Sequence, residues 1–442
     1  MTVPTDPPPG TVPATAKQPG SIYDRWPWVV PTVWSERMLT ALEQGVKGGV
    51  WFSLIDKVYA KPTLQEAWAR VQANAGAAGI DAQSVQMFGQ RADWHLEQLH
   101  RQLRQGTYVP KPVRRVWIDK PGSTDKRPLG IPAVRDRVVQ TALRLVLEPI
   151  WEAGFAEHSY GFRPGRGCKD ALRRVEALLK AGYTWVVDAD LKSYFDTIPH
   201  DRLMAELRRR VADGRVLGLI ASYLQAKVMD GLQAWEPERG SPQGAVISPL
   251  LSNIYLDSLD HQMAAAGWAM VRYADDFVIL CRSQAEAERA LAQVRQHVEA
   301  MGLVLHPTKT RLVDASQPGG FDFLGYHFER GMRWPRTKSL NKLKDTIRDL
   351  TRRTSGLALE VVIARLNRVL YGWFQYFKHS HRTTFPRLDK WIRMRLRSVL
   401  RRRQGGRGRG RGLDHQRWPN AYFATLGLYN LTTAHAVAGQ SH

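Results

Sequence analysis

Two adjacent aspartates, Asp275 and Asp276, lie inside an otherwise apolar, β-prone run that extends from Val271 to Cys281. Apolar residues on both sides of such a pair predict a β-hairpin that carries two carboxylates at its tip. Neighbouring carboxylates repel each other, and apolar strands leave little room for the charge to disperse, so a cation is expected to share the site. A polar turn would also explain the pair, because aspartate is a common turn residue.

A second acidic cluster follows a predicted strand from Trp185 to Asp190. The two-residue period of a strand places Asp188 and Asp190 on one face, with Asp190 at the strand's end. Two aromatic residues, Tyr194 and Phe195, come next, and a helix is predicted from about residue 200 to 211. A carboxylate between a strand and a helix is common in proteins, so this cluster indicates a catalytic site only together with the other motifs.

Cationic and glycine-rich segments lie upstream of both clusters and between them. Residues 108–132 predict a basic β-hairpin whose tip carries Lys120 and Arg127, where they can reach a triphosphate or a nucleic-acid backbone. Arg163 lies in a loop with several glycines, which allow close backbone approach. Gln243 stands at the exposed end of a turn-rich loop before a capped apolar helix. Each segment alone could be an ordinary solvated surface.

The charge of the chain is strongly basic and unevenly distributed. Lys and Arg number 64 against 41 Asp and Glu, which gives a formal charge of +23 and indicates a polyanionic partner. Residues 329–411 contain 24 of the basic residues and only 5 acidic ones, on three stripes of apolar residues that predict a small helical bundle. A flexible arginine-glycine arm suited to phosphate contacts is expected next, with Arg401, Arg402, Arg403, Arg407, Arg409 and Arg411.

Composition also excludes several classes of protein. No run of about 18 apolar residues exists, so no membrane span and no membrane partner are expected. The N-terminus lacks a secretion signal, and two cysteines, Cys168 and Cys281, provide neither a disulfide framework nor a four-cysteine zinc site. A cytoplasmic location fits these features. Residues 1–22 are rich in proline and are expected to form a disordered tail.

In this order the parts are those of a nucleic-acid polymerase. Primer extension requires two divalent ions, and Asp190, Asp275 and Asp276 form the minimum set of ligands. Ligands that are all oxygen select Mg²⁺, with Mn²⁺ as a substitute. Either Tyr194 or Phe195 could lie under the incoming sugar and sense a 2′-hydroxyl.

The motifs together resemble one family. YADD at 273–276, DLKSYFD at 190–196, YGFRPG at 160–165, GSPQGAVISP at 240–249 and FLG at 323–325 resemble a group II intron reverse transcriptase/maturase over about residues 50–435. The resemblance implies an α+β right-hand polymerase, with fingers and palm containing antiparallel sheet, followed by an α-helical thumb. The expected divisions are an N-terminal extension of the fingers at 23–105, fingers and palm at 106–330, a thumb/maturase domain at 331–400, and a basic arm with a small DNA-binding region at 401–442.

The resemblance also implies roles and partners. Lys120, Arg127, Arg163 and Gln243 would contact the nucleotide, and Lys309 would neutralise or protonate the leaving group. The expected function is RNA-directed DNA polymerisation together with binding of a group II intron RNA, splicing and target-primed mobility. The partners would be that RNA, target DNA with its primer, and dNTPs. Paired cysteines of the family's endonuclease are absent, so no second-strand cleavage is expected. A splicing cofactor without a polymerase role, and a domesticated reverse transcriptase in phage defence or DNA repair, remain alternatives.

Overall fold

The computed structural model describes residues 20–119 and 126–440, so the expected disordered tail lies almost wholly outside the described residues. At its end, Ser21 caps a short helix, α1 (Ile22–Arg25), by accepting a hydrogen bond from the backbone N–H of Tyr23. The chain divides into two compact units. One comprises the residues up to 174 with 189–279 and 289–310, and the other comprises 175–188, 280–288 and 311–442.

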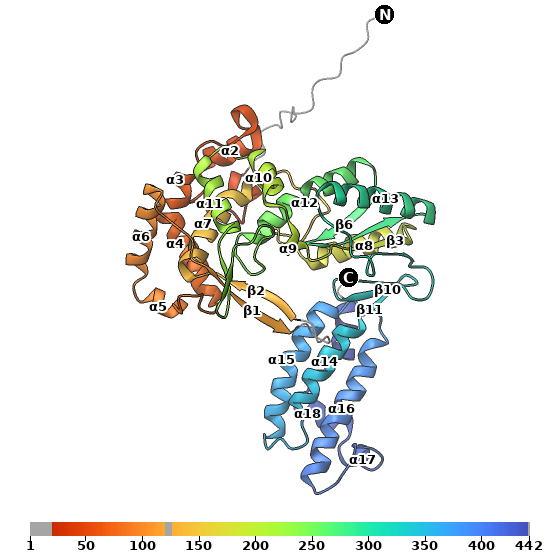
Figure 1. Cartoon of the computed structure of the whole chain (residues 1–442). Coiled ribbons are helices and arrows are strands. Elements are labelled where there is room, and N and C mark those ends of the chain that lie inside the picture. The colour runs from red at the N-terminus through yellow and green to blue at the C-terminus, as the bar shows by residue number, and fades with distance from the viewer. Residues whose placement is uncertain (1–19, 120–125, 441–442) are drawn as a thin grey trace, which may run out of the picture. The chain divides into compact units, whose positions relative to one another are not determined.

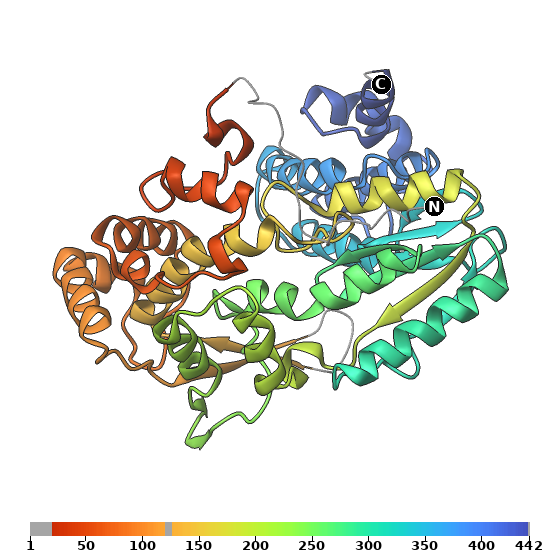
Figure 2. The ribbon, with the colours of Figure 1, turned by 90° about the horizontal axis from the view of Figure 1, so that it is seen from above.

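Helices dominate the N-terminal part of the first unit. Helix α7 is buried along almost its whole length and forms the centre of this part, and α4 packs along it. The indole N–H of Trp34 donates to the backbone oxygen of Leu145 in α7, at 3.1 Å, and so ties the lead-in segment to this core. Figure 2 shows these red and orange helices gathered beside α7. Their bounds are α2 (Glu36–Gln44), α3 (Ile55–Tyr59), α4 (Lys61–Asn74), α5 (Val85–Gly89), α6 (Ala92–Gln105) and α7 (Val134–Glu152).

A four-stranded sheet in the first unit contains the predicted basic hairpin. Its strands are β1 (Val113–Asp119), β2 (Lys126–Ile131), β4 (Val228–Asp230) and β5 (Gln233–Trp235), in the order β2-β1-β4-β5. Trp117 pairs with Pro128 and Ile118 pairs with Arg127 across the antiparallel β1–β2 ladder. Because side chains alternate between the faces of a strand, Trp117 and Arg127 lie on opposite faces of this hairpin. The two faces can therefore meet different ligands.

A second four-stranded sheet holds both acidic clusters, in the strand order β6-β7-β3-β8. Strand β3 pairs antiparallel with β8, with Val186 opposite Val313. The predicted strand from Trp185 to Asp190 and the predicted aspartate hairpin are both confirmed. The strands and the helices near them are β3 (Trp185–Asp190), β6 (Ala269–Tyr273), β7 (Asp276–Cys281), β8 (Arg311–Asp314), α8 (Cys168–Lys180), α9 (Tyr194–Thr197), α10 (His200–Arg208), α11 (Gly214–Leu224), α12 (Ser248–Ala265) and α13 (Gln284–Ala300).

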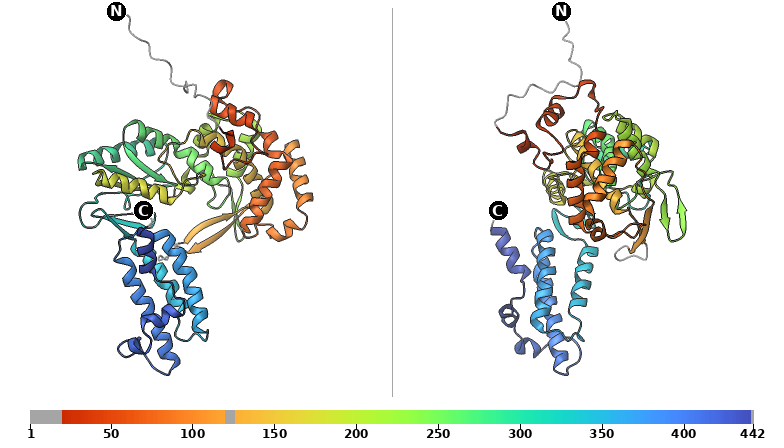
Figure 3. Two further views of the ribbon diagram at one scale, coloured as in Figure 1. Left: turned by 180° about the vertical axis from the view of Figure 1, so that it is seen from behind. Right: turned by 90° about the vertical axis from the view of Figure 1, so that its left-hand side faces the viewer.

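The three helices predicted from apolar stripes lie in the second unit and run side by side in Figure 1 and Figure 3. Their apolar faces form one core, in which Ile347, Leu366 and Leu396 are buried. Together with the sheets, this bundle confirms the expected α+β class. None of the helices in the described part of the chain has the length and apolar character that a membrane crossing requires. The remaining elements are β9 (Phe321–Phe323), β10 (Tyr326–Glu329), β11 (Met332–Pro335), α14 (Thr337–Leu350), α15 (Leu359–Phe377), α16 (Thr384–Arg403), α17 (Asp414–Arg417), α18 (Asn420–Thr425) and α19 (Leu431–Gln440).

The arginine-glycine run differs from the expected extended arm. Its first three arginines form the last turn of α16, and the rest of the run folds back on that helix. The backbone N–H of Gly410 donates to Ser398 Oγ at 3.0 Å, and a Cβ at Gly410 would lie 2.4 Å from Arg397 Cβ. Arg401 forms an ion pair with Asp414 at 2.8 Å. The other five arginines of the run are exposed.

A buried ion pair fastens strand β6 to helix α12. The Arg272 side chain is fully buried and that of Asp260 is 3% exposed. Arg272 Nε donates to Asp260 Oδ1 at 2.7 Å, and Nη2 donates to the second carboxylate oxygen. Two parallel charge-assisted bonds compensate for part of the large cost of burying both charges.

Removing one partner of this pair is expected to destabilise the protein severely. Arg272→Met should lower the free energy of unfolding by about 3–5 kcal/mol, because it leaves the Asp260 carboxylate buried without its cation. Urea denaturation measures this loss. Arg209→Met, which removes an exposed arginine paired with Glu206, is the matched control and should cost less than about 1 kcal/mol. Equal losses for the two variants would refute the importance of the buried pair. The double variant Arg272→Met/Asp260→Leu should regain part of the loss.

Candidate active site

The aspartate pair lies at the tip of the hairpin that β6 and β7 form. Ala274 and Asp275 make the two-residue turn between the strands. Ala274 has a φ of 59°, a left-handed conformation that disfavours residues with a Cβ. Arg272 Nη1 donates to the Ala274 carbonyl at 2.8 Å and so holds the strained turn from below. The turn therefore has a fixed conformation that presents Asp275.

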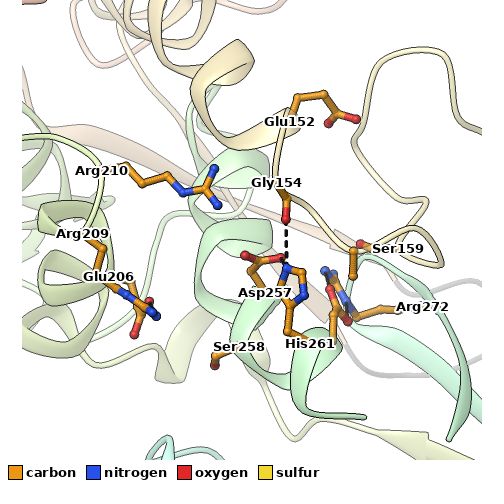
Figure 4. A network of polar contacts seen from close by, with 12 residues as sticks. Glu152, Gly154, Ser159, Glu206, Arg209, Arg210, Asp257, Ser258, His261 and Arg272 are labelled. Carbon is orange, nitrogen blue, oxygen red and sulfur yellow. Dashed lines mark hydrogen bonds and ion pairs between the residues drawn. The ribbon is translucent and has the colours of Figure 1, made fainter. Parts of the chain in front are cut away.

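The same guanidinium organises the loop beside the hairpin. Arg272 Nη1 also donates to Asn253 Oδ1 at 3.0 Å, and Asn253 Nδ2 donates to the Gly161 carbonyl at 2.8 Å. Gly161 packs so closely on the turn that a Cβ there would lie 2.2 Å from the Ala274 nitrogen. Figure 4 shows Arg272 beside Ser159 of this loop, with which its backbone pairs. One buried side chain thus sets the position of α12, the loop and the hairpin tip.

Asp190 lies where β3 ends, and cations already accompany the aspartates of this strand. The Asp190 carboxylate, about a third exposed, forms an ion pair with Lys309. Asp188, on the same face, pairs with Arg311 at 3.0 Å. The backbone N–H of His306 donates to the Asp190 carbonyl at 2.7 Å, which holds the segment carrying Lys309 against the end of the strand. Lys309 therefore lies beside Asp190, one of the three expected metal ligands.

Electrostatics link Asp275 to Asp190 and to the basic hairpin. Burial raises the pKa of the Asp275 carboxyl, and the negative charge of Asp190 raises that pKa further. A backbone hydrogen bond and the charges of Arg127 and Arg272 oppose these effects. The structure thus brings Asp190, Asp275 and Arg127, which are widely separated in the sequence, within electrostatic range of one another. Two carboxylates that repel each other in a partly buried site favour a shared cation.

The expected ligands are all carboxylates, which are oxygen donors of the kind that a hard divalent ion prefers. Among the described residues, no three His, Cys, Asp or Glu side chains lie close enough together to hold a metal ion, so the structure does not gather Asp190, Asp275 and Asp276 into one cluster. Oxygen ligands from only a few carboxylates, completed by water and substrate, are characteristic of Mg²⁺ sites. The chemistry of Asp190, Asp275 and Asp276 is therefore compatible with Mg²⁺ held partly by the substrate.

The two aromatic residues after Asp190 have different environments. Tyr194 is 2% exposed, and its hydroxyl donates to the Ser252 carbonyl at 2.8 Å. Burial raises the pKa of Tyr194 and keeps the hydroxyl in this contact. Tyr194 is therefore not placed to meet a sugar, which corrects one of the two aromatic candidates. Phe195 is half-buried and lines a cavity together with Gln243.

Four residues are expected to contact the nucleotide, and their surroundings differ. Arg127 is exposed on β2, within electrostatic range of Asp275. Gln243 is half-buried. Its backbone carbonyl accepts a hydrogen bond from the backbone N–H of Gly130 in β2, at 2.6 Å. Lys120 lies outside the described residues. Arg163 is buried in contacts with the protein itself.

Arg163 holds the protein's own loop in place. Its side chain is 2% exposed and pairs with Glu152 at the end of α7, at 2.7 Å. Its Nη1 also donates to the carbonyls of Ala156 and Ser159, at 2.6 and 2.8 Å. These contacts occupy the guanidinium, so the expected nucleotide contact of Arg163 does not fit this structure. These bonds fix the loop that contains Gly161.

Sequence reasoning did not anticipate the residues that position the site. Arg272, Asn253 and Asp260 have no part in the expected ligand set, yet they carry the hairpin. Two signals were available in the sequence. Arg272 is a charged residue within an apolar strand, and Asn253 and Asp260 are seven residues apart, on one face of the same helix. Polar residues in such places require buried partners.

Two family models match the chain. The model for reverse transcriptase (RNA-dependent DNA polymerase) matches residues 118–328, which include both acidic clusters. The model for the group II intron maturase-specific domain matches residues 340–418, which include the helical bundle. The second match begins close to the start of α14 and ends beside α17.

Several curated proteins are similar to parts of the chain. Protein YkfC of Escherichia coli is 38% identical over 295 residues, which are 58% of this chain and 77% of that protein. The group II intron-encoded protein LtrA of Lactococcus lactis is 37% identical over 196 residues, 44% of this chain and 32% of LtrA. Nuclear intron maturase 2 of Arabidopsis thaliana is 30% identical over 253 residues, 48% of this chain and 33% of that protein. The chain thus spans only about a third of the length of LtrA and of the plant maturase.

A solved structure of a partial Cas6-RT-Cas1–Cas2 complex shares 25% identity, with a TM-score of 0.37 over 56% of this chain and 42% of that chain. The two family models match successive segments of the chain, and the curated relatives include proteins named for group II introns and for intron maturation. This chain belongs to the family of group II intron-encoded reverse transcriptases and maturases.

Proposed function

We propose that the protein is an RNA-directed DNA polymerase that also binds a group II intron RNA and promotes its splicing and its mobility by target-primed reverse transcription. The observation that carries the proposal is that Asp275, in the turn of the aspartate hairpin, lies within electrostatic range of both Asp190 and Arg127. Carboxylates for metal ions and an exposed cation for a triphosphate are the elements that nucleotidyl transfer requires.

The proposed roles follow from these positions. Asp190, Asp275 and Asp276 would hold two Mg²⁺ ions, whose charge favours attack by the primer 3′-hydroxyl and departure of pyrophosphate. Arg127, with Lys120, binds the triphosphate of the dNTP. Lys309, which pairs with Asp190, neutralises or protonates the leaving group.

The other proposed contacts concern the nucleotide and the nucleic acids. Gln243 and Phe195 line one cavity, and we assign them to the nucleotide and its sugar. The basic segment that matches the maturase-specific model supports binding of intron RNA, and the DNA-binding role is assigned to the C-terminal residues. Five exposed arginines of the folded-back run are available for phosphates: Arg402, Arg403, Arg407, Arg409 and Arg411.

The position of the hairpin should control the rate. Reacting groups must be aligned within a fraction of an ångström, and a displacement of about 1 Å can cost 10²-fold in rate. The hairpin turn rests directly on Gly161, so this glycine limits how far the Asp275 carboxylate can move. A side chain at this position tests the geometry without changing any candidate ligand.

Asp275→Asn should abolish incorporation of dNTPs and leave RNA binding intact. Loss of a carboxylate that supports the metal ions should slow single-turnover primer extension on an RNA template by at least about 100-fold. Asp93→Asn, which changes an exposed aspartate of α6, is the control and should extend primers normally. Undiminished incorporation by Asp275→Asn would refute the catalytic assignment. A splicing assay on the same variant separates the two activities, because RNA binding alone does not need this carboxylate.

Phe195→Val should admit ribonucleotides. A smaller side chain beneath the sugar leaves room for a 2′-hydroxyl, so the preference for dNTPs over rNTPs should fall by roughly tenfold or more in competitive primer extension. Tyr194→Phe removes only the buried hydroxyl that contacts Ser252, and it should leave this preference unchanged. The assignment fails if the two variants discriminate alike.

Gly161→Ala should reduce the extension rate by about 100-fold, because the new Cβ would lie 2.2 Å from the Ala274 nitrogen and displace the turn. Gly167→Ala in the same loop is a matched control, since its Cβ would meet only Asp170 Oδ2, at 3.8 Å. Single-turnover kinetics provide the readout, and melting temperatures verify that both variants fold. Equal rates for the two variants would show that the contact at Gly161 does not position the site.

A further inference from the structure

A cavity of about 580 Å³ opens on one face of the sheet that contains β1 and β2. Arg115 and Trp117 line it from β1, and Pro128 and Gly130 line it from β2. The strand register pairs Arg115 with Gly130 and Trp117 with Pro128, so these four residues share a face. Arg127 lies on the opposite face. Arg127, the proposed triphosphate contact, therefore does not line this cavity, although Phe195 and Gln243 of the proposed nucleotide site do.

The wall of the cavity presents aromatic faces. The Arg115 guanidinium lies 4.7 Å from the ring centroid of Trp235 and 5.7 Å from that of Trp117. The two indoles are 36% and 46% exposed. The indole N–H of Trp117 donates to Asp230 Oδ2 at 2.8 Å, which fixes the orientation of its ring. The guanidinium lies over both indole rings, and the surface of the indoles that stays exposed is one on which a planar ring can stack.

The charges around the cavity select the ligand further. Asp196, Glu236 and Glu238 line it, and Lys227 pairs with Glu236 at 3.6 Å. Arg115 and Arg239 also line the cavity, but the three carboxylates outnumber them and disfavour a phosphate inside it. Carboxylates do accept hydrogen bonds from the amino and imino groups of a base edge. The volume lies in the range of small-ligand sites and easily accommodates one nucleobase.

We propose that this cavity holds an unpaired nucleobase of an RNA strand, stacked on Trp117 and Trp235, with its phosphates outside. The inference rests on the proposed function insofar as RNA is the ligand, and it adds a contact on the far face of the β1–β2 hairpin. Phe195 and Gln243 also line the cavity. A base bound here therefore touches the same two residues that we assign to the incoming nucleotide.

Binding of defined RNAs by the full-length chain tests the proposal. The probes are a DNA-primed RNA template with a single-stranded extension of eight uridines, the same duplex without the extension, and an RNA hairpin with an eight-nucleotide loop. Fluorescence anisotropy measures the dissociation constants of Trp117→Ala, Trp235→Ala and the control Trp94→Ala, which removes an exposed indole of α6. Melting temperatures and the conservative variants Trp117→Phe and Trp235→Phe control for folding.

The two cavity variants should bind the extended template or the hairpin loop roughly tenfold more weakly, with no change for the blunt duplex. Loss on the extended template assigns the base to the template strand, and loss on the hairpin assigns it to a loop of folded RNA. The phenylalanine variants and Trp94→Ala should bind as the wild type does. With 5-iodouridine in the RNA, photocrosslinks should map to peptides that contain Trp117 or Trp235. Wild-type affinity of both alanine variants for every RNA would overturn the proposal, as would loss of the crosslinks on addition of ATP alone.

Primer extension by the same proteins separates this inference from the polymerase function. If the wild type fails to extend a primer while the alanine variants still bind RNA weakly, the polymerase function falls and the base-binding cavity stands. If the wild type extends the primer and the alanine variants bind RNA normally, the cavity falls alone.

Discussion

The buried guanidinium of Arg272 is the interaction on which the candidate active site depends. It forms two bonds to Asp260, one to Asn253 and one to the turn carbonyl of Ala274. A charge without solvent is stable only when each donor has a partner, so all these groups must keep their places together. The strained turn, the loop at Gly161 and helix α12 are consequently one unit. The buried Arg272–Asp260 ion pair thus sets the position of the hairpin turn that carries Asp275, whose carboxylate must be reached by substrate.

The parts of the fold that were predicted correctly depend on local sequence patterns. Apolar residues around Asp275 and Asp276 specify the hairpin, and a period of two specifies the strand that ends at Asp190. These local patterns do not predict which residues contact each other when they are far apart in the sequence. An arginine among glycines looks the same whether it meets a phosphate or, as Arg163 does, Glu152. The choice between Tyr194 and Phe195 depends on the carbonyl of Ser252, 58 residues from Tyr194.

Charge is arranged differently near the aspartate hairpin and in the segment matched by the maturase-specific model. Near the hairpin, acidic groups are matched with cations, as Asp190 is with Lys309 and Asp188 is with Arg311. Local balance of this kind lets carboxylates gather without unfolding the strands that carry them. The segment matched by the maturase-specific model is instead strongly unbalanced, and most arginines of its folded-back run are exposed. Excess positive charge there remains free to act on a polyanion.

The alternation of side chains along β1 has a consequence for how this hairpin can change. Arg115 and Trp117 line the cavity, whereas Ile118 shares its face with Arg127. Inserting a single residue into the strand would exchange the two faces from that point onward and misplace both sets of contacts at once. Inserting two residues would preserve the faces and alter only the reach of the tip. A length change within β1 keeps both sets of contacts only if it occurs in an even step or if a β-bulge absorbs the odd residue.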